Sequence, residues 1–415
     1  MKILWVKAGK LLPVDTGGKI RSYNLLRFLG RDHEVTLLSY YGGKRDLEYE
    51  AAIEKELPGT LIVHTGAPDS NSLDRGLDYL WRLPKSAPYA VSKFTHPKVA
   101  KALAMKLSGN YFDVAVCDFL SASLNFPQTL RTPTVLFQHN VESSLWERLA
   151  ATESNPIKKL AFKIESGKMT SYERAALHRF HHVIAVSEHD REQMMAMDSS
   201  CEITVVPTGV DTRKFVPAPP STTNPPRIVF TGSMDWEPNI DAVEYFCREI
   251  WPGVRDKFPN AIFQIVGRHP HPKVQQLASD SVHVTGTVPS VSGYLRDATV
   301  VVVPLRVGGG TRLKIFEAMT MGKALVSTSI GAEGLDVKSG HDLVLADIPA
   351  SFTQAILLLL RDAHARRKYE QAALQSASHH DWSKIAMGLA AVLQKVIDGS
   401  GDRRTAEKDA VPVHS

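Results

Sequence analysis

The sequence is poor in cysteine: only Cys117, Cys201 and Cys247 occur among 415 residues. They are far apart, and no two of them form a Cys-x-x-Cys pair, so the sequence predicts neither a disulfide framework nor a zinc site. Few and unpaired cysteines are typical of a reducing compartment. We therefore expect a cytoplasmic protein.

Long apolar runs are also missing. No stretch approaches the roughly 20 apolar residues of a membrane-spanning helix, and Lys7 interrupts an amino-terminal apolar segment that is too short for a signal peptide. The run ILLLL at 356–360 fits one face of a buried helix. The net charge of +5 is a mild excess. It does not indicate a nucleic-acid-binding protein, although it favours anionic ligands or an anionic membrane surface.

What is present is a repeated α/β pattern, in a chain long enough for two domains. The apolar runs at 2–6 and 34–40, separated by a glycine loop and a helix, predict the start of a parallel sheet. A segment rich in proline and small polar residues follows at 206–226, and the pattern then restarts. The continuous valines of TVVVVPL indicate strands covered on both faces. The sequence thus predicts two tandem, doubly wound Rossmann-like α/β domains that bind ligands in the cleft they face.

The predicted domain boundaries follow from these segments. An amino-terminal domain spans 1–205 and is completed by an amphipathic helix at 380–397. The linker covers 206–226, and a carboxy-terminal domain covers 227–379. The tail, 398–415, is polar without an apolar period, so we expect it to be disordered.

The segment 305–335 carries the strongest chemical signal. Three glycines at 308–310 follow an apolar run and precede a helix-like stretch that begins with Arg312 and Lys314 and continues to Glu317. Glycine allows backbone N–H groups to approach a ligand closely, and a helix N-terminus attracts anions. Arginine adds planar charged donors that suit phosphate oxygens. These features predict a nucleotide-diphosphate site.

The motifs GGK (17–19), AVSEHD (185–190), FTGSM (230–234), VGR (266–268) and GGGTRLKIFEAM (308–319) occur in this order. Their order and spacing resemble family 4 glycosyltransferases, which are retaining, metal-independent enzymes of GT-B architecture. GGGTRLKIFEAM and FTGSMDWEPNIDAV are most similar to bacterial enzymes of exopolysaccharide assembly. The resemblance implies transfer of a sugar from a nucleotide-sugar donor to a saccharide or lipid-linked saccharide acceptor, with no nucleic acid as partner. It also implies no metal ion and no cofactor, since the nucleotide-sugar is a co-substrate.

The resemblance also implies roles for individual residues. Glu317 matches the acid that holds the donor ribose, and Thr287 and Val288 fall in the loop that faces the nucleobase. His139, at the end of the apolar run TVLFQH, matches a histidine near the donor sugar. Retaining transfer in this fold has no agreed protein nucleophile, and we nominate none. We expect stabilisation of the leaving group by cations and a helix dipole to be the dominant electrostatic effect.

Two positions depart from the family pattern. Gly309 occupies a position where a second, sugar-contacting glutamate is common, and Ser233 and Asn239 occupy positions where cations clamp the diphosphate. We expect Arg312 and Lys314, with Arg268, to supply that charge instead. The predicted site residues are His139, Arg312 and Lys314 for catalysis; Gly232, Ser233, Arg268, Thr287, Val288, Gly308, Gly309, Gly310, Thr311 and Glu317 for the donor; and Gly17 and Gly18 for the transfer loop.

Simpler interpretations stand beside these. His139 could be a core histidine, and Glu142 and Glu188 could cap helices. Two other functions share features with the chain: a UDP-sugar 2-epimerase, which has the same two-domain fold, and a non-catalytic sugar-nucleotide or glycan binder. Basic residues at 158–168 and 85–106 could form either a solvated helix face or a cationic face for peripheral contact with the inner face of an anionic membrane.

Overall fold

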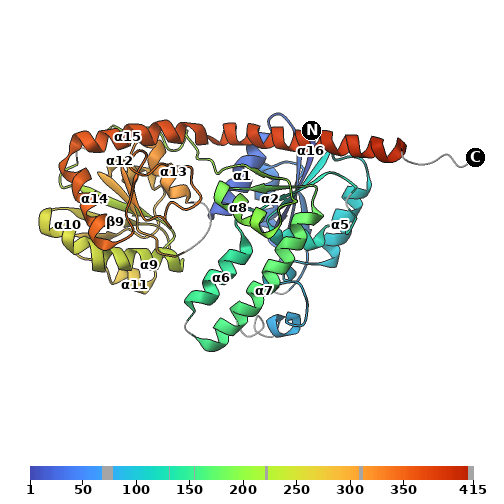
Figure 1. Ribbon diagram of the computed structural model, residues 1–415, viewed down its shortest axis with the longest axis horizontal. Helices are drawn as coiled ribbons and strands as arrows, with labels where there is room; N and C mark the ends of the chain where they lie inside the picture. Colours follow the sequence, from blue (N-terminus) through green and yellow to red (C-terminus); the bar gives the residue numbers. More distant parts are fainter. Residues whose placement is uncertain (68–77, 130, 154, 220–222, 308–311, 410–415) are drawn as a thin grey trace, which may run out of the picture. The chain divides into compact units, whose positions relative to one another are not determined.

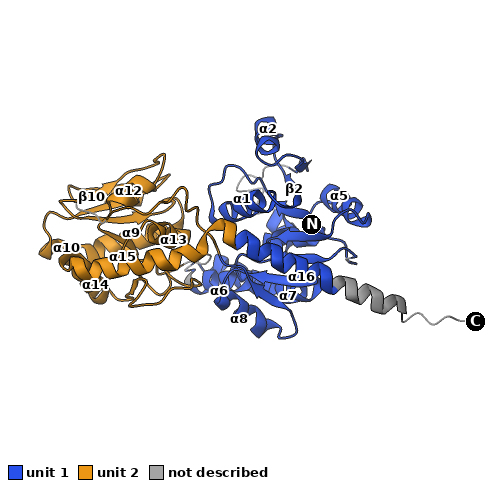
Figure 2. Cartoon of the chain, turned by 90° about the horizontal axis from the view of Figure 1, so that it is seen from above, with its two compact units in different colours: residues 1–207, 385–415 blue, residues 208–384 orange. Residues whose placement is uncertain are grey.

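The computed structural model describes residues 1–67, 78–129, 131–153, 155–219, 223–307 and 312–409, without the side chains of residue 152 and residues 400–409. The chain divides into two compact units (Figure 2). Unit 1 consists of residues 1–207 and 385–415, and unit 2 of residues 208–384. Each unit is built around one parallel sheet with helices, which confirms the predicted α/β fold.

Unit 1 has a seven-stranded sheet in the order β3-β2-β1-β4-β5-β6-β7 (Figure 1). Its strands are β1 (Lys2–Ala8), β2 (Glu34–Tyr41), β3 (Leu61–His64), β4 (Val114–Asp118), β5 (Thr134–Phe137), β6 (His182–Ala185) and β7 (Ile203–Val205). Its helices are α1 (Gly17–Leu29), α2 (Leu47–Glu56), α4 (Tyr89–Ser92), α5 (Pro97–Ser108), the 3-10 helix η1 (Leu120–Asn125), α6 (Glu142–Thr152), α7 (Pro156–Arg179), α8 (Glu188–Met197) and most of α16 (Trp382–Asp409).

Unit 2 has a six-stranded sheet in the order β10-β9-β8-β11-β12-β13. The strands are β8 (Arg227–Thr231), β9 (Ile262–Val266), β10 (Val282–Val284), β11 (Val300–Val303), β12 (Leu325–Ser327) and β13 (Val344–Leu345). The helices are α9 (Glu237–Tyr245), the π-helix η2 (Phe246–Ile250), α10 (Trp251–Lys257), α11 (Pro272–Gln275), α12 (Ser292–Asp297), α13 (Leu313–Thr320), α14 (Pro349–Arg361), α15 (Ala363–Ala377) and the 3-10 helix η3 (Ser378–His380).

Both sheets reverse their strand order beside the first strand, because β1 lies next to β4 and β8 lies next to β11. Loops that leave adjacent strands in opposite directions open a crevice at the carboxyl ends, where open α/β sheets bind ligands. The valines of β11 are all buried, as expected for a strand covered on both faces.

Three local predictions differ from the structure. Residues 17–19 are the first turn of α1 rather than a loop, since the Ile20 amide donates to the Thr16 carbonyl. The short strands β3, β7, β12 and β13 were not expected. Helix α16 runs to Asp409, past the predicted helix end at 397. Residues after Gly399 are polar but include good helix formers and no proline before Pro412, so polarity alone does not end the helix.

Candidate functional site

In unit 1, a buried carboxylate gathers polar groups at the carboxyl ends of neighbouring strands. Asp118 ends β4, Lys7 lies near the end of β1, and His139 follows β5 by two residues. The Asp118 carboxylate accepts hydrogen bonds from Lys7 Nζ (2.9 Å), Ser22 Oγ (2.6 Å) and His139 Nε2 (2.8 Å). All four side chains are buried. The sequence predicted His139 here and missed the other three residues.

Charge fixes the protonation states of this cluster. Burial alone would raise the pKa of Asp118, but the Lys7 charge and the hydrogen bonds from His139 and Ser22 hold it well below its ordinary range. Burial lowers the pKa of His139 to about 3, despite the opposing effect of Asp118. The imidazole is therefore neutral and the carboxylate ionised.

The tautomer of His139 follows from these states. An ionised carboxylate only accepts hydrogen bonds, so Nε2 carries the single ring proton and Nδ1 has a free lone pair. Nδ1 is buried and has no hydrogen-bond partner among the described residues. The arrangement presents a hydrogen-bond acceptor, which suits a sugar hydroxyl.

An aromatic ring and a glycine hold the imidazole in place. Phe119 stacks on His139 with ring centroids 3.6 Å apart, and its backbone has a φ of +69°, which is unusual outside glycine. A Cβ on Gly18 would lie 2.5 Å from Phe119 Cζ. Gly18 is thus required by the packing against Phe119. Gly17 begins the same helix, α1, and is exposed.

Glu142 and Glu188, which the sequence left open as helix caps, have different surroundings, and Glu142 lies near a third glutamate, Glu173. Glu173 accepts hydrogen bonds from the amides of Glu142 and Ser143, and so satisfies the N-terminus of α6. Burial and the nearby Glu173 raise the pKa of Glu142 to about 7. Glu188 pairs with Arg191 on the surface of α8, so it lies in an ordinary first helical turn.

In unit 2, the loops after β8 and β9 meet in backbone contact. The Gly232 amide donates to the Val266 carbonyl at 3.0 Å, and the Met234 amide donates to the Arg268 carbonyl at 2.9 Å. A Cβ on Gly267 would lie only 1.6 Å from the Gly232 oxygen. Glycine at 267 is therefore a steric requirement for these loops.

Lys314, from α13, reaches these loops. Its Nζ donates to Asn239 Oδ1 at 2.9 Å and lies 4.2 Å from the centroid of the Phe230 ring. An added Cβ on Gly232 would lie 2.9 Å from the same nitrogen. Burial and the Arg312 charge lower the pKa of Lys314 to about 7. A lysine from α13 thus lies beside Gly232 and Asn239, where the resemblance implied cations from the loop itself.

The remaining predicted residues of unit 2 are arranged around this lysine. Arg312 is buried directly before α13, and Glu317 lies about one turn after Lys314. Burial raises the pKa of Glu317, while the charges of Lys214 and Lys314 oppose that rise. Lys214 was not predicted. Arg268 Nε donates to Ser233 Oγ at 2.8 Å, so these two predicted donor-binding side chains contact each other.

Other predicted donor-binding residues lie after β10 or outside the described structure. Thr287 is exposed and Val288 packs against the core of unit 2, just after Gly286, whose φ is +69°. Gly308, Gly309, Gly310 and Thr311 lie outside the described residues.

Comparison with known proteins identifies the family. Residues 225–362 match the family described as "Glycosyl transferases group 1", and residues 16–214 match "Glycosyltransferase Family 4". The chain is a family 4 glycosyltransferase with the GT-B fold. This glycosyltransferase is 25% identical over 265 residues to the phosphatidyl-myo-inositol mannosyltransferase of Mycobacterium leprae, a match that covers 60% of this chain and 67% of that protein.

Solved structures resemble the glycosyltransferase over nearly its whole length. Sucrose-phosphate synthase from Thermosynechococcus elongatus has a TM-score of 0.70 and 14% identity, covering 96% of this chain and 99% of that one. Anabaena HepE, solved with UDP and glucose, has a TM-score of 0.63 and 14% identity, covering 95% and 99%. At these identities the likeness shows the fold.

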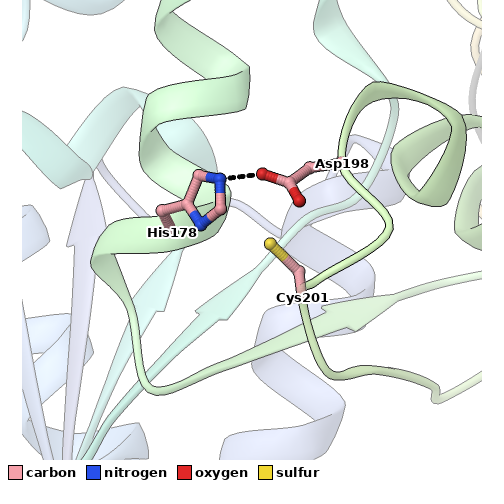
Figure 3. Close-up of side chains that lie close together, drawn as sticks. All are labelled: His178, Asp198 and Cys201. Carbon is pink, nitrogen blue, oxygen red and sulfur yellow. Dashed lines mark ion pairs between the residues drawn. The ribbon is translucent and has the colours of Figure 1, made fainter.

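A separate polar cluster of the glycosyltransferase lies at the amino ends of the unit 1 strands, opposite the carboxyl ends that carry the candidate site. His178 forms an ion pair with Asp198, and Cys201 points toward the same carboxylate (Figure 3). These residues come from the end of α7 and from the segment before β7, so they lie at the amino ends of the strands. Asp198 Oδ1 also accepts hydrogen bonds from Ser200, and this cluster takes no part in the candidate site.

The missed residues had a readable signal. Lys7 and Asp118 are charged residues at the ends of otherwise apolar strands, where a buried charge needs a partner. Opposite charges on two such strands indicate an ion pair once the strands are known to be neighbours. Nothing in the sequence showed that β1 and β4 are adjacent, however, because Lys7 and Asp118, at the end of β4, are 111 positions apart.

Proposed function

We propose that this glycosyltransferase moves a hexosyl group from a nucleotide-sugar to a saccharide or lipid-linked saccharide acceptor, with retention of configuration and without a metal ion, in bacterial exopolysaccharide assembly. The observation that carries the donor assignment is the position of Lys314 beside Gly232 and Asn239, with Glu317 on the same helix. Lys314 lies just beyond the carboxyl end of β8, and Glu317 follows it by about one turn of α13, which supports this assignment.

The chemistry follows from these groups. Transfer breaks the bond between the anomeric carbon and the diphosphate oxygen, so negative charge develops on the departing nucleoside diphosphate. Arg312 and Lys314 stabilise that charge, and the Glu317 carboxylate accepts hydrogen bonds from two ribose hydroxyls. In unit 1, His139 Nδ1 accepts a hydrogen bond from a sugar hydroxyl. The acceptor hydroxyl oxygen bonds to the anomeric carbon, and its proton passes to the departing diphosphate oxygen.

The names of two similar proteins suggest which donors and acceptors to test first. One relative is a phosphatidyl-myo-inositol mannosyltransferase, and HepE was solved with UDP and glucose. These support a mannosyl or glucosyl donor and a lipid-linked acceptor as first choices. A thermal-shift panel of UDP-, GDP-, ADP- and dTDP-sugars reads the base directly, because a ligand that binds only the native state raises its melting temperature.

Activity measurements separate the candidate functions. Release of nucleoside diphosphate, by transfer or by slow hydrolysis, supports a transferase, whereas no release above background leaves a non-catalytic binder. Interconversion of UDP-sugars without an acceptor supports a 2-epimerase. Arg312→Ala should weaken donor affinity or turnover about tenfold or more, since a charge-assisted hydrogen bond contributes about 1.5–3 kcal/mol. Unchanged kinetics in this variant would exclude Arg312 from the diphosphate site.

A further inference from the structure

Helices α6 and α7 form a pair whose outer end extends beyond the sheet of unit 1 (Figure 1). The buried residues of α7 all lie between Glu165 and Leu177, and none is among residues 156–164. Phe162 in that first stretch contacts the ring of Trp146 in α6, with centroids 5.7 Å apart. The first two turns of α7 are therefore held by α6 and have one face open to solvent.

That open face is apolar. Ile157, Leu160 and Ile164 are spaced by three and four residues, so they lie along one side of the helix. Ile157 is 80% exposed and Leu160 is 60% exposed, and Ile164 is exposed as well. Single exposed apolar residues are ordinary, but a contiguous row on a projecting helix indicates a contact surface.

A second exposed apolar pair lies beside the row. Lys168 Nζ donates to the Leu83 carbonyl at 2.6 Å, which ties the segment containing Leu80 and Trp81 to α7, one turn from Ile164. Trp81 is 77% exposed, and Leu80 is exposed too. Tryptophan is enriched where proteins meet the headgroup region of a bilayer, because its ring is apolar and its N–H is polar.

Lysines flank the apolar row. Lys158 and Lys163 are exposed and Lys159 is half-buried, and none of the three forms an ion pair with a carboxylate in the described part of the chain. Long lysine side chains reach phosphate headgroups while apolar neighbours enter the acyl boundary. An apolar row flanked by positive charge complements an anionic bilayer. It suits neither bulk water nor a purely apolar partner surface.

We propose that the outer end of α7, with Leu80 and Trp81, is the surface by which this enzyme docks on a bilayer of anionic phospholipid. The proposed contact is peripheral. No helix in the described part of the chain is long and apolar enough to cross a membrane. Of the two basic segments considered from the sequence, 158–168 belongs to this surface, and the second, 85–106, contacts α7 near the start of that second segment, where the Tyr89 amide donates to Glu165. Helix α5, in the second, lies away from the outer end of α7 in both views (Figures 1 and 2).

The test is co-sedimentation of the full chain with vesicles of phosphatidylcholine alone or with 30% phosphatidylglycerol added. We expect binding to the anionic vesicles that weakens as salt rises. K158E/K159E should weaken the binding about tenfold or more, because each lysine near an anionic surface contributes measurably. The matched control is K101E/K106E on α5, which changes the net charge equally and should bind nearly as the parent does.

A second test variant and its matched control address the apolar row of Ile157, Leu160 and Ile164. I157S/L160S should also lower the binding about tenfold or more, whereas L47S/M387S, at exposed apolar sites elsewhere, should not. Trp81 should shift its emission to the blue on anionic vesicles, and W81F should lose that shift. Apart from Lys159, which is half-buried, the substituted side chains are exposed, and all of them lie outside the candidate site. The variants should therefore fold and keep transfer to a water-soluble acceptor.

Several results would overturn the proposal. Equal losses in the test and control pairs would mean non-specific adsorption, and no loss in the test pairs would mean that another surface binds. If the parent chain is a dimer by light scattering and I157S/L160S is a monomer with no vesicle binding in either, the row pairs two copies instead. Vesicle binding needs no donor or acceptor, so its failure is distinguishable from failure of the proposed function.

Discussion

His139 Nε2 lies 2.8 Å from Asp118 Oδ1, and this contact leaves His139 Nδ1 as an acceptor without a partner in the described chain. Asn and Gln substitutions at position 139 distinguish the roles of the two ring nitrogens. The Asn side chain reaches the Nδ1 position, and the Gln side chain reaches the Nε2 position. H139Q should keep the contact with Asp118 and lose about tenfold in kcat/KM, as expected for one lost hydrogen bond.

H139N is the matched comparison. It should retain more activity than H139Q, because its amide oxygen can replace Nδ1. Steady-state kinetics on both variants, with thermal melts to confirm folding, decide the point. Equal activity of H139Q and the parent would make His139 a core residue.

The Asp118 carboxylate should matter for stability as well as for the site. D118N leaves the Lys7 charge buried without its partner, which costs about 3–5 kcal/mol in the free energy of unfolding. K7M/D118N removes both charges and should recover much of the loss. D32N, on the exposed surface, is the control. Urea unfolding at pH 7 measures the stability of all three variants. A K7M/D118N protein no more stable than D118N would contradict the ion-pair account.

The pH dependence of stability follows from the same group. The pKa of Asp118 is lowered in the folded chain, so its contribution is present above the ordinary carboxyl pKa of about 4 and is lost as pH falls through the folded value. The parent should therefore lose more stability than K7M/D118N between pH 5 and pH 2. Parallel curves for the two proteins would show that other carboxylates dominate.

Lys314 should couple donor binding to proton uptake. Its pKa is lowered to about 7, and a bound diphosphate favours the charged form. Calorimetry at pH 8 in buffers of different ionisation enthalpy should show uptake of a proton when nucleoside diphosphate binds, and K314M should abolish it. Without ligand, the unfolded chain binds the extra proton, so stability should rise with pH from about 7 to about 10. Equal enthalpies in all buffers would contradict this protonation state.

Two glycines should tolerate no side chain. In G267A the new Cβ would collide with the Gly232 carbonyl, and in G18A it would collide with Phe119 and disturb the ring that stacks on His139. We expect G267A to lower stability by more than about 1 kcal/mol and G18A to lower activity as well. G167A, where a Cβ in α7 would meet no atom within 4 Å, should be neutral or stabilising by about 0.5–1 kcal/mol. A stable G267A would mean that the two loops separate easily.

Removal of metal ions should leave transfer unchanged. Arg312 and Lys314 supply positive charge at the proposed diphosphate site, which is the role that a divalent cation plays in other phosphate sites. Activity after dialysis against EDTA should equal that of the untreated enzyme. A loss that Mg²⁺ or Mn²⁺ restores would contradict the proposed mechanism.

The sequence by itself determined the fold class, because apolar runs of strand length alternate with amphipathic helices whatever the tertiary contacts are. It also showed charged residues at the start of α13, since Arg312, Lys314 and Glu317 are local to one helix. The tertiary structure alone decided which residues share a site. Asp118 and Lys7 are 111 positions apart, and Lys314 and Asn239 are 75 apart. These pairs meet only because β1 lies beside β4 and β8 beside β11, and strand order depends on long-range packing that no local pattern records.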